Sequence, residues 1–395
     1  MRRELRDVVV IGAGPAGSIT ARRLAEQGYD VALLEEHDHV GQPVHCTGLL
    51  GVDAFEEFDL PRTTILGEAG GARFWGAAGQ SVMVRSASIR AAVIDRAALD
   101  RWLADEAVRA GVDLRSGCRA EAVQVGPAEV AITGRGFDGP LRARACVLAC
   151  GASYRFHRAL GLGVPTVFLQ SAQLESPFSR AEDVEVRFGR DVAPAGFGWL
   201  VPLERGGAPH ARIGLMSETR SRERFNAFLT TLCERVGLDV STMPSPRLKM
   251  LPLGPVDKTY ADRVLAVGDA AGLVKPTTGG GIYYGLLTGA LAADVLGEGL
   301  RENRLDESFL RRYESKWRKR LGKEIRAGLA FRRIAAKLSD ESIDSLIELA
   351  RVNGIVPLLQ ETASFNWHSK AAMALLADAS FRKIVFKSWR SAIPI

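Results

Sequence analysis

Three observations along the chain predict an α/β protein with a central parallel sheet. A run of branched aliphatic residues at 8–11 is typical of a strand buried on both faces, and it leads directly into a glycine-rich turn. A helical segment at 15–27 follows the turn and is expected to end at Gly28. A second buried strand then ends at Glu35. This order of strand, turn, helix and strand is the Rossmann-type arrangement, in which a dinucleotide binds at the turn.

The turn has the spacing G-x-G-x-x-G, formed by Gly12, Gly14 and Gly17. The first glycine allows the tight turn, the second lets the backbone approach a pyrophosphate, and the third lets the helix press against the strand. Glu35 follows Gly17 by eighteen residues, where a carboxylate can accept the hydroxyls of an adenosine ribose. We therefore expect a dinucleotide without a 2′-phosphate, the alternative being a glycine turn of an unrelated α/β protein.

A second glycine-rich stretch lies at 268–296, after a strand predicted at 263–269. Asp269 ends that strand and is placed to bond a polyol chain. Three consecutive glycines, Gly279, Gly280 and Gly281, then introduce a long helix, whose bare N-terminal amides suit the N1 and C2 carbonyl region of a reduced, anionic flavin. The two motifs, about 250 residues apart, resemble those of the glutathione-reductase-type fold in its hydroxylase-like branch. The expected cofactor is therefore FAD.

Between about 160 and 250 the sequence changes to short strand-like segments with one helix at 223–236. We therefore predict an α/β protein, α+β overall, in which a Rossmann-type FAD-binding domain carries an inserted antiparallel-sheet substrate domain and is followed by a C-terminal helical region. The predicted boundaries are 1–69, 87–158 and 255–300 for the discontinuous FAD-binding domain, 70–86 and 159–254 for the substrate-binding domain, and 301–395 for the helical region.

Composition and cysteine usage indicate an ordinary globular protein of a reducing compartment. Hydrophobic residues make up 47% of the chain and charged residues 25%, which is typical of a protein with a substantial core rather than of a disordered one. The five cysteines are odd in number and form no spacing typical of a metal site. We expect no bound metal and a cytoplasmic location.

The net charge of +6 is concentrated near the C-terminus, where residues 301–395 hold 19 basic and 11 acidic side chains. Two interpretations of this basic tail stay open. In the first, the basic tail docks the protein on the anionic inner face of a membrane. In the second, the basic residues form a solvated helical face. Nucleic acid is not an expected partner, because the charge is not joined to a recognised reading module.

Three stretches of the chain resemble the geranylgeranyl reductase family: VHCTGLL at 44–50, PAGFGWLVP at 194–202 and PTTGGGIYYG at 276–285. The family's usual segment is P-x-x-Y-x-W-x-F-P, which Pro194, Trp199 and Pro202 match. Phe197 stands in place of the tyrosine, and Val201 in place of the phenylalanine. The resemblance extends over roughly the first 300 residues.

The resemblance implies an FAD-dependent reductase that saturates carbon–carbon double bonds of a geranylgeranyl or other prenyl chain. It implies that the strand with Phe197, Trp199, Val201 and Pro202 lines the prenyl-binding cavity. It also implies a set of FAD contacts: Ala16, Glu35, Cys46, Thr47, Leu49, Arg96, Ala120, Asp269, Gly281 and Ile282. Arg96 has a case of its own, since it opens a helix where it can meet a phosphate or ribityl oxygen, whereas Ala120 rests on the resemblance alone.

Reduction of an isolated alkene requires that the double bond lie against the flavin, that water be excluded and that a proton be supplied. The expected container is an apolar tunnel, for which the candidates, unless they are ordinary core residues, are Phe74, Trp75, Phe168, Phe188, Phe197, Trp199 and Val201. Cys46 is the catalytic candidate, as a loop thiol that tunes the ring, relays the proton or gates the loop. Tyr283 and Tyr284 are weaker candidates for the proton donor.

Two other functions stay open, a flavin-dependent monooxygenase or halogenase acting on a hydrophobic substrate and a noncatalytic electron-transfer flavoprotein. Within the reductase interpretation, the prenyl chain belongs to a lipid, a diphosphate, a quinone or a chlorophyll precursor. The electron donor is NAD(P)H or a ferredoxin, because the chain shows no second nucleotide fingerprint.

Overall fold

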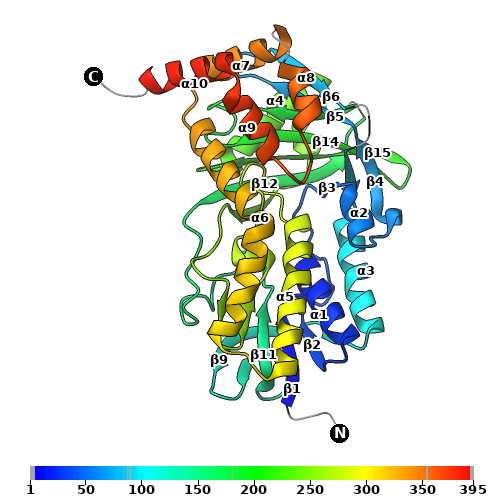
Figure 1. The fold of residues 1–395 in the computed structure, drawn as a ribbon. Helices are drawn as coiled ribbons and strands as arrows, with labels where there is room; N and C mark the ends of the chain where they lie inside the picture. The colour runs from blue at the N-terminus through cyan, green and yellow to red at the C-terminus, as the bar shows by residue number, and fades with distance from the viewer. Residues whose placement is uncertain (1–4, 87, 89, 180, 353–354, 392–395) are drawn as a thin grey trace. The chain divides into compact units, whose positions relative to one another are not determined.

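The computed structural model describes residues 5–391 except 87, 89, 180 and 353–354, and it divides into two compact units (Figure 1). Unit 1 contains Met1–Val44, Arg96–Val167 and Pro252–Ile325, and unit 2 contains His45–Asp95, Phe168–Leu251 and Arg326–Ile395. This division differs from the expected boundaries at several junctions. Residues 45–69 and 87–95, expected with the FAD-binding domain, group with unit 2, whereas 159–167 and 252–254, expected with the substrate-binding domain, group with unit 1. The expected C-terminal helical region is divided, with 301–325 in unit 1 and 326–395 in unit 2.

Unit 1 is built on an eight-stranded sheet of β1 (Leu5–Ile11), β2 (Val31–Leu34), β8 (Asp113–Arg115), β9 (Arg119–Val125), β10 (Val130–Arg135), β11 (Leu141–Leu148), β17 (Tyr260–Ala261) and β18 (Val264–Ala266). Its main strand order is β17-β18-β11-β1-β2-β8. The central strand β1 pairs in parallel with both β11 and β2. The expected parallel sheet is confirmed. The antiparallel strands β9 and β10 were not predicted, because their side chains are mostly half-buried or exposed and show no apolar run.

Three helices of unit 1 are α1 (Pro15–Glu26), α3 (Arg96–Arg109) and α5 (Ile282–Glu302). Figure 1 shows α1 and α5 side by side. The two helices approach closely because Gly289 has no side chain, and a Cβ there would overlap the carbonyl oxygen of Ala16. The Thr20 hydroxyl donates a hydrogen bond to the Gly289 carbonyl at 3.0 Å. The two glycine-rich stretches thus begin helices that pack against each other.

Unit 2 contains a seven-stranded sheet of β5 (Gly71–Trp75), β6 (Ser81–Arg85), β12 (Phe168–Pro177), β13 (Val184–Arg187), β14 (Phe197–Arg205), β15 (Ala208–Ser217) and β16 (Arg247–Pro252), the last of which ends in unit 1. Its order is β16-β12-β15-β14-β13-β5-β6. Strands β12, β15, β14 and β13 run antiparallel to their neighbours in that series, as expected. The pair β13 and β5 runs parallel instead, which is possible because no tight turn connects these distant segments.

A three-stranded sheet in unit 2 consists of β3 (Leu49–Gly51), β4 (Ile65–Ala69) and β7 (Ala91–Ile94). Pairing of β7 with both β3 and β4 explains why residues 45–69 and 87–95 group with this unit. The short helix α2 (Asp53–Glu57) follows β3.

Helix α4 (Ser221–Val236) covers one face of the seven-stranded sheet. Its side chains Phe225 and Phe228 pack against Leu200 of β14 and Ile213 of β15 in one buried cluster. Side chains alternate between the two faces of a strand, so Phe197, Trp199 and Val201 of β14 belong to the face opposite α4.

The expected C-terminal helices are confirmed as α6 (Glu307–Ala335), α7 (Asp340–Val352), α8 (Ile355–Thr362), α9 (Ser369–Ala377) and α10 (Ala379–Ser391).

Replacement of Phe225 by alanine tests the packing of α4 on the sheet. Phe225 is fully buried, and loss of such a side chain leaves a cavity that costs about 3–5 kcal/mol. We expect Phe225→Ala to shift urea unfolding, followed by circular dichroism, to a lower midpoint. The control Val352→Ala changes a side chain that is 68% exposed and should shift it little. Equal midpoints for the two variants would contradict this packing.

Candidate cofactor and substrate sites

The first glycine turn of unit 1 combines two tightly packed positions with one open position. Gly12 has φ +107°, and a Cβ there would overlap the Ala149 carbonyl oxygen. A Cβ on Gly17 would overlap the carbonyl oxygen of Gly12. At Gly14, by contrast, a Cβ would meet nothing within 4 Å. The backbone is therefore open at the residue where a pyrophosphate is expected to approach, and this arrangement fits the ADP half of FAD.

The Glu35 carboxylate is fixed at the edge of this turn. Residue Glu35 is only 9% exposed. Its Oε2 accepts a hydrogen bond from the Ala13 amide at 3.1 Å, and its Oε1 accepts one from the His37 amide at 3.1 Å. The carboxylate is thus held by the backbone beside the glycines, as the expected contact with a ribose requires.

The second motif places a carboxylate at the N-terminus of α5. Asp269 lies in a short 3-10 helix, Gly268–Ala271, and a Cβ on Gly281 would overlap its Oδ1 atom. Glycine at 281 therefore allows the Asp269 carboxylate to reach the first turn of α5, which Ile282 opens. Gly279, with φ +70°, makes the turn before it, and Gly280 packs on the stem of Lys275.

The structure brings the two motifs together within unit 1. The methyl group of Ala16, in the first turn of α1, lies 3.1 Å from the position of a Cβ on Gly268. The start of α1, which follows Gly12 and Gly14, therefore lies beside the segment that carries Asp269. One extended ligand with a phosphate-containing half and a polyol fits this arrangement.

Two residues outside the predicted site, Tyr154 and His157, support the second motif. The Tyr154 hydroxyl donates to the Asp269 carbonyl at 2.7 Å, and Nε2 of His157 lies 2.6 Å from the Ala270 carbonyl oxygen. Burial lowers the pKa of His157, although its hydrogen bond to Ala270 acts in the opposite direction. Burial also raises the pKa of Tyr154. Both side chains come from a loop without a recognisable pattern, so no signal in the sequence indicated them.

Two expected FAD contacts of unit 1 have other partners in this structure. Arg96, the first residue of α3, makes a bidentate ion pair with Asp100, with distances of 2.7 and 3.1 Å. Ala120 is buried in β9, and its carbonyl accepts a hydrogen bond from Arg155 at 3.4 Å.

Tyr284, a weaker candidate for proton donation, is buried within α5, and this burial raises its pKa. Its hydroxyl keeps its proton at neutral pH.

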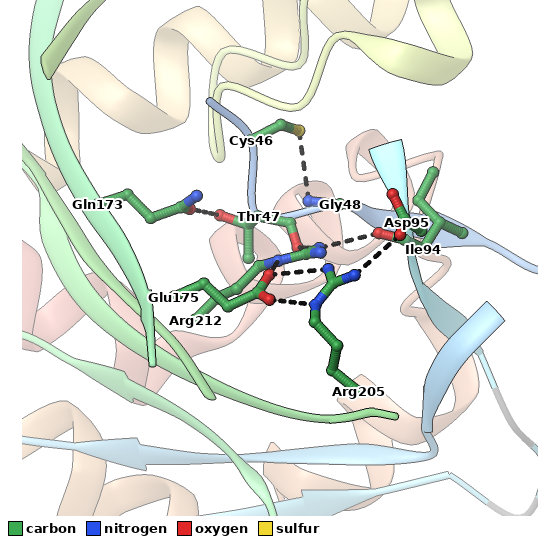
Figure 2. A network of polar contacts seen from close by, with 9 residues as sticks. All are labelled: Cys46, Thr47, Gly48, Ile94, Asp95, Gln173, Glu175, Arg205 and Arg212. Carbon is green, nitrogen blue, oxygen red and sulfur yellow. Dashed lines mark hydrogen bonds and ion pairs between the residues drawn. The ribbon is translucent and has the colours of Figure 1, made fainter. Parts of the chain in front are cut away.

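The expected contacts Cys46, Thr47 and Leu49 belong to unit 2. Figure 2 shows the polar contacts of Cys46 and Thr47. Thr47 donates its hydroxyl proton to Oε1 of Gln173 at 2.7 Å, and Leu49 begins β3. The Gly48 amide donates to Sγ of Cys46 at 3.3 Å. Cys46 is half-buried. Cys118, Cys146 and Cys233 are buried. Cys150 is half-buried like Cys46, and loss of solvent around its thiol raises its pKa to about 12.

A row of aromatic rings continues across the face of the seven-stranded sheet opposite α4. Ring centroids are 6.4 Å apart for Phe74 and Phe188, 6.0 Å for Phe188 and Phe197, and 5.9 Å for Phe197 and Trp199. The Trp199 indole covers Gly214, where a Cβ would overlap the ring. Gly214 of β15 pairs with Trp199 on one neighbouring strand, β14, and with Gln173 on the other, β12. Gln173 is the residue that accepts the hydrogen bond from Thr47. The Cys46 loop and the aromatic row therefore share one face of the sheet.

Three of the expected substrate residues lie on the other face. Trp75 packs against the guanidinium groups of Arg187 and of Arg235 on α4, at 4.5 and 5.6 Å. By strand alternation Phe168 points the same way as Ala172, and Pro202 the same way as Ala211, and both alanines belong to the α4 cluster. Trp75 and Phe168 therefore do not share a face of the sheet with Trp199, because the strand register, which local sequence patterns do not show, places them on opposite faces.

The joined glycine motifs and the parallel sheet of unit 1 define an FAD-dependent oxidoreductase. The family model described as lycopene cyclase protein matches residues 7–346. Digeranylgeranylglycerophospholipid reductase 2 of Methanothermobacter thermautotrophicus is 31% identical over 86% of this chain and 90% of its own length. The corresponding reductase of Methanocaldococcus jannaschii is 28% identical over 87% of this chain and 90% of its own length. The chain belongs to the geranylgeranyl reductase family of FAD-dependent enzymes.

Solved structures agree with this assignment. A geranylgeranyl bacteriochlorophyll reductase-like protein from Thermoplasma acidophilum superposes with a TM-score of 0.84 and 25% identity, over 98% of this chain and 99% of that one. The halogenase PltM in complex with FAD has a TM-score of 0.68 and 16% identity, over 98% of this chain and 93% of that one. The latter likeness shows the shared flavoprotein fold alone.

Replacement of Glu35 by alanine tests the first motif. Hydrogen bonds to a charged group contribute about 1.5–3 kcal/mol, so we expect the dissociation constant of FAD to rise about 10- to 100-fold in a flavin fluorescence titration. The neighbouring exposed carboxylate of Glu36 serves as the control. If Glu35→Ala and Glu36→Ala bind FAD equally well, Glu35 does not contact the ribose.

Proposed function

We propose that this protein saturates the double bonds of geranylgeranyl chains carried by a glycerophospholipid. The carrier is supported by relatives that are named for that substrate and match nearly the whole chain. The observation that carries the proposal in the structure is the aromatic row from Phe74 to Trp199, a continuous series of apolar rings on the same face of the sheet as the Cys46 loop. An apolar chain of this kind has no polar groups to pair, so such a surface is the appropriate recognition element.

Bound reduced FAD supplies the hydride for the reaction, and the residues of this chain supply the remaining requirements. The glycine motifs and Glu35 hold the cofactor. The rings of Phe197 and Trp199 orient the alkene and exclude water. Cys46 holds a proton on Sγ and gives it to the alkene carbon that does not receive the hydride, after which solvent returns a proton to the thiolate.

The substrate class is tested anaerobically with the FAD-loaded protein reduced by dithionite. The reduced protein is offered a geranylgeranyl glycerophospholipid, geranylgeranyl diphosphate, a prenyl quinone and a chlorophyll precursor in turn. Mass spectrometry should show gains of two hydrogens per double bond, with the glycerophospholipid reduced fastest. Parallel reactions with NADPH or with reduced ferredoxin in place of dithionite identify the electron donor. Reduction of none of the four substrates would contradict the proposal.

Replacement of Cys46 by alanine tests the proton donor. A positioned proton donor contributes roughly 10²- to 10⁴-fold to a rate, so we expect Cys46→Ala to bind FAD normally and to lose alkene reduction by about that factor. The matched control is Cys150→Ala, which removes a thiol of unit 1 whose pKa is raised to about 12. Unchanged turnover in Cys46→Ala would remove Cys46 from the mechanism.

We also propose that α10 holds the protein at the anionic inner face of a membrane, where a lipid substrate resides. No helix in the described part of the chain is long and apolar enough to cross a bilayer. One face of α10 exposes Arg382, Lys383, Phe386 and Lys387, and Phe386 is 61% exposed. Cations beside an exposed aromatic ring favour peripheral binding to anionic lipid.

The five free thiols support a reducing, cytoplasmic location.

Liposome flotation tests this contact. Each cation near an anionic surface contributes about 1 kcal/mol, so Lys383→Gln should weaken binding to vesicles containing phosphatidylglycerol about fivefold. The exposed Lys323 of α6 provides the control, because Lys323→Gln removes the same charge from another helix. Equal binding by both variants, or equal binding to neutral vesicles, would contradict docking through α10.

A further inference from the structure

A buried arginine contacts the loop that carries Cys46 (Figure 2). Arg212 lies in β15, and its side chain is only 1% exposed. Its Nη1 atom donates to the Thr47 carbonyl at 2.8 Å and to the Ile94 carbonyl at 2.9 Å. Its Nε atom donates to Oε2 of Glu175 at 2.8 Å. One guanidinium thus joins the loop, the end of β7 and the strand β12.

The turn is shaped to receive this guanidinium. Gly48 has φ +70°, which side chains rarely adopt, and a Cβ there would overlap Nη1 of Arg212. The same Cβ would lie 2.7 Å from the Ile94 carbonyl oxygen. Glycine is therefore required at 48 for the loop backbone to approach the arginine, and any movement of Arg212 changes the support of the turn.

The charge of Arg212 is balanced by Glu175, which in turn is held by Arg205. Burial alone would raise the pKa of Glu175, but hydrogen bonds and charges from Arg205 and Arg212 lower it below its usual value. Arg205 also pairs with Asp95 at 2.9 Å, and hydrogen bonding to Glu175 raises its pKa. The carboxylate is therefore ionised at neutral pH. A buried cation requires such a partner, because removal of its charge from water costs several kcal/mol.

Three consecutive residues of the loop are fixed by this arrangement. The Thr47 carbonyl is bound by Arg212, and the Thr47 hydroxyl is bound to Gln173. The Gly48 amide donates to the Cys46 sulfur. The direction of this amide depends on the Thr47–Gly48 peptide, whose oxygen Arg212 binds. The position of Sγ therefore depends on a side chain from β15.

We propose that Arg212 is a positioning residue that fixes the Thr47–Gly48 peptide and thereby the thiol of Cys46. This inference rests on the proposed role of Cys46 in alkene reduction. Arg212 itself is not proposed to touch substrate or cofactor. It acts through the peptide, and its own chemistry is that of a buried, charge-assisted donor of hydrogen bonds.

The test measures the chemical reactivity of the thiol separately from turnover. In the FAD-loaded protein, the rate of alkylation of Cys46 by iodoacetamide is followed by peptide mass spectrometry across pH. Arg212→Met keeps an unbranched apolar stem in the buried site and removes the hydrogen-bond donors. Loss of charge-assisted hydrogen bonds worth about 1.5–3 kcal/mol should change the alkylation rate by at least about tenfold, lower kcat to a similar extent and leave KM nearly unchanged.

Arg212→Lys provides the graded variant and remains informative if Arg212→Met does not fold. A lysine keeps the buried charge and can reach one carbonyl, so the alkylation rate should lie between those of wild type and Arg212→Met, with faster amide exchange in residues 45–50. The matched control is Arg85→Gln. Arg85 is exposed, ends the edge strand β6 and pairs with Asp183. This control should leave alkylation and kcat unchanged.

Two results would overturn the inference. Folded Arg212→Met with alkylation and kcat within about twofold of wild type would show that the thiol does not depend on the arginine, because loss of the bonds predicts at least about tenfold. If only Arg212→Lys folds, unchanged alkylation and unchanged amide exchange would show the same. Normal turnover in Cys46→Ala would instead overturn the role of Cys46 and leave a change of alkylation in the Arg212 variants intact, so the two failures are distinguishable.

Discussion

The organisation of unit 2 depends on one buried cation, the guanidinium of Arg212. Its partners come from the loop before β3, from the end of β7 and from β12, so one side chain ties segments separated by more than a hundred residues. A buried charge without these acceptors would destabilise the fold by several kcal/mol. The ionised state of Glu175, maintained by Arg205, completes the balance. The same contacts hold the Cys46 loop on the face of the sheet that carries the aromatic row.

A different constraint governs unit 1, where backbones must approach more closely than side chains allow. Glycines at 12, 17 and 281 bring carbonyl oxygens or a carboxylate to positions that a Cβ would occupy, whereas Gly14 faces open space. Glycine at 289 lets α1 and α5 pack, which places the two motifs beside each other. These features fit FAD. Together with relatives that match over most of their length, they account for membership of the geranylgeranyl reductase family.

Local patterns in the sequence were sufficient for the parallel sheet, the glycine turns and the terminal helices, because each depends on neighbouring residues. The division at residue 45 was not predicted, since it depends on β7 pairing with β3 and β4. The position of Trp75 on the face opposite the aromatic row was not predicted either, because it follows from strand register. The pairing of Arg212 with Glu175 had no signal either, because any of 52 basic side chains can pair with any of 46 acidic ones until the fold brings two together.

We infer that reduced flavin in this protein gives its electrons to a geranylgeranyl chain. The most direct measurement is the absorbance of the flavin in the reduced holoprotein under strict exclusion of oxygen, after addition of a geranylgeranyl glycerophospholipid or of its fully saturated analogue. The unsaturated lipid should reoxidise the flavin in proportion to the double bonds consumed, and the saturated lipid should not. A flavin that stays reduced with the unsaturated lipid, yet reoxidises at once in air, would contradict this inference.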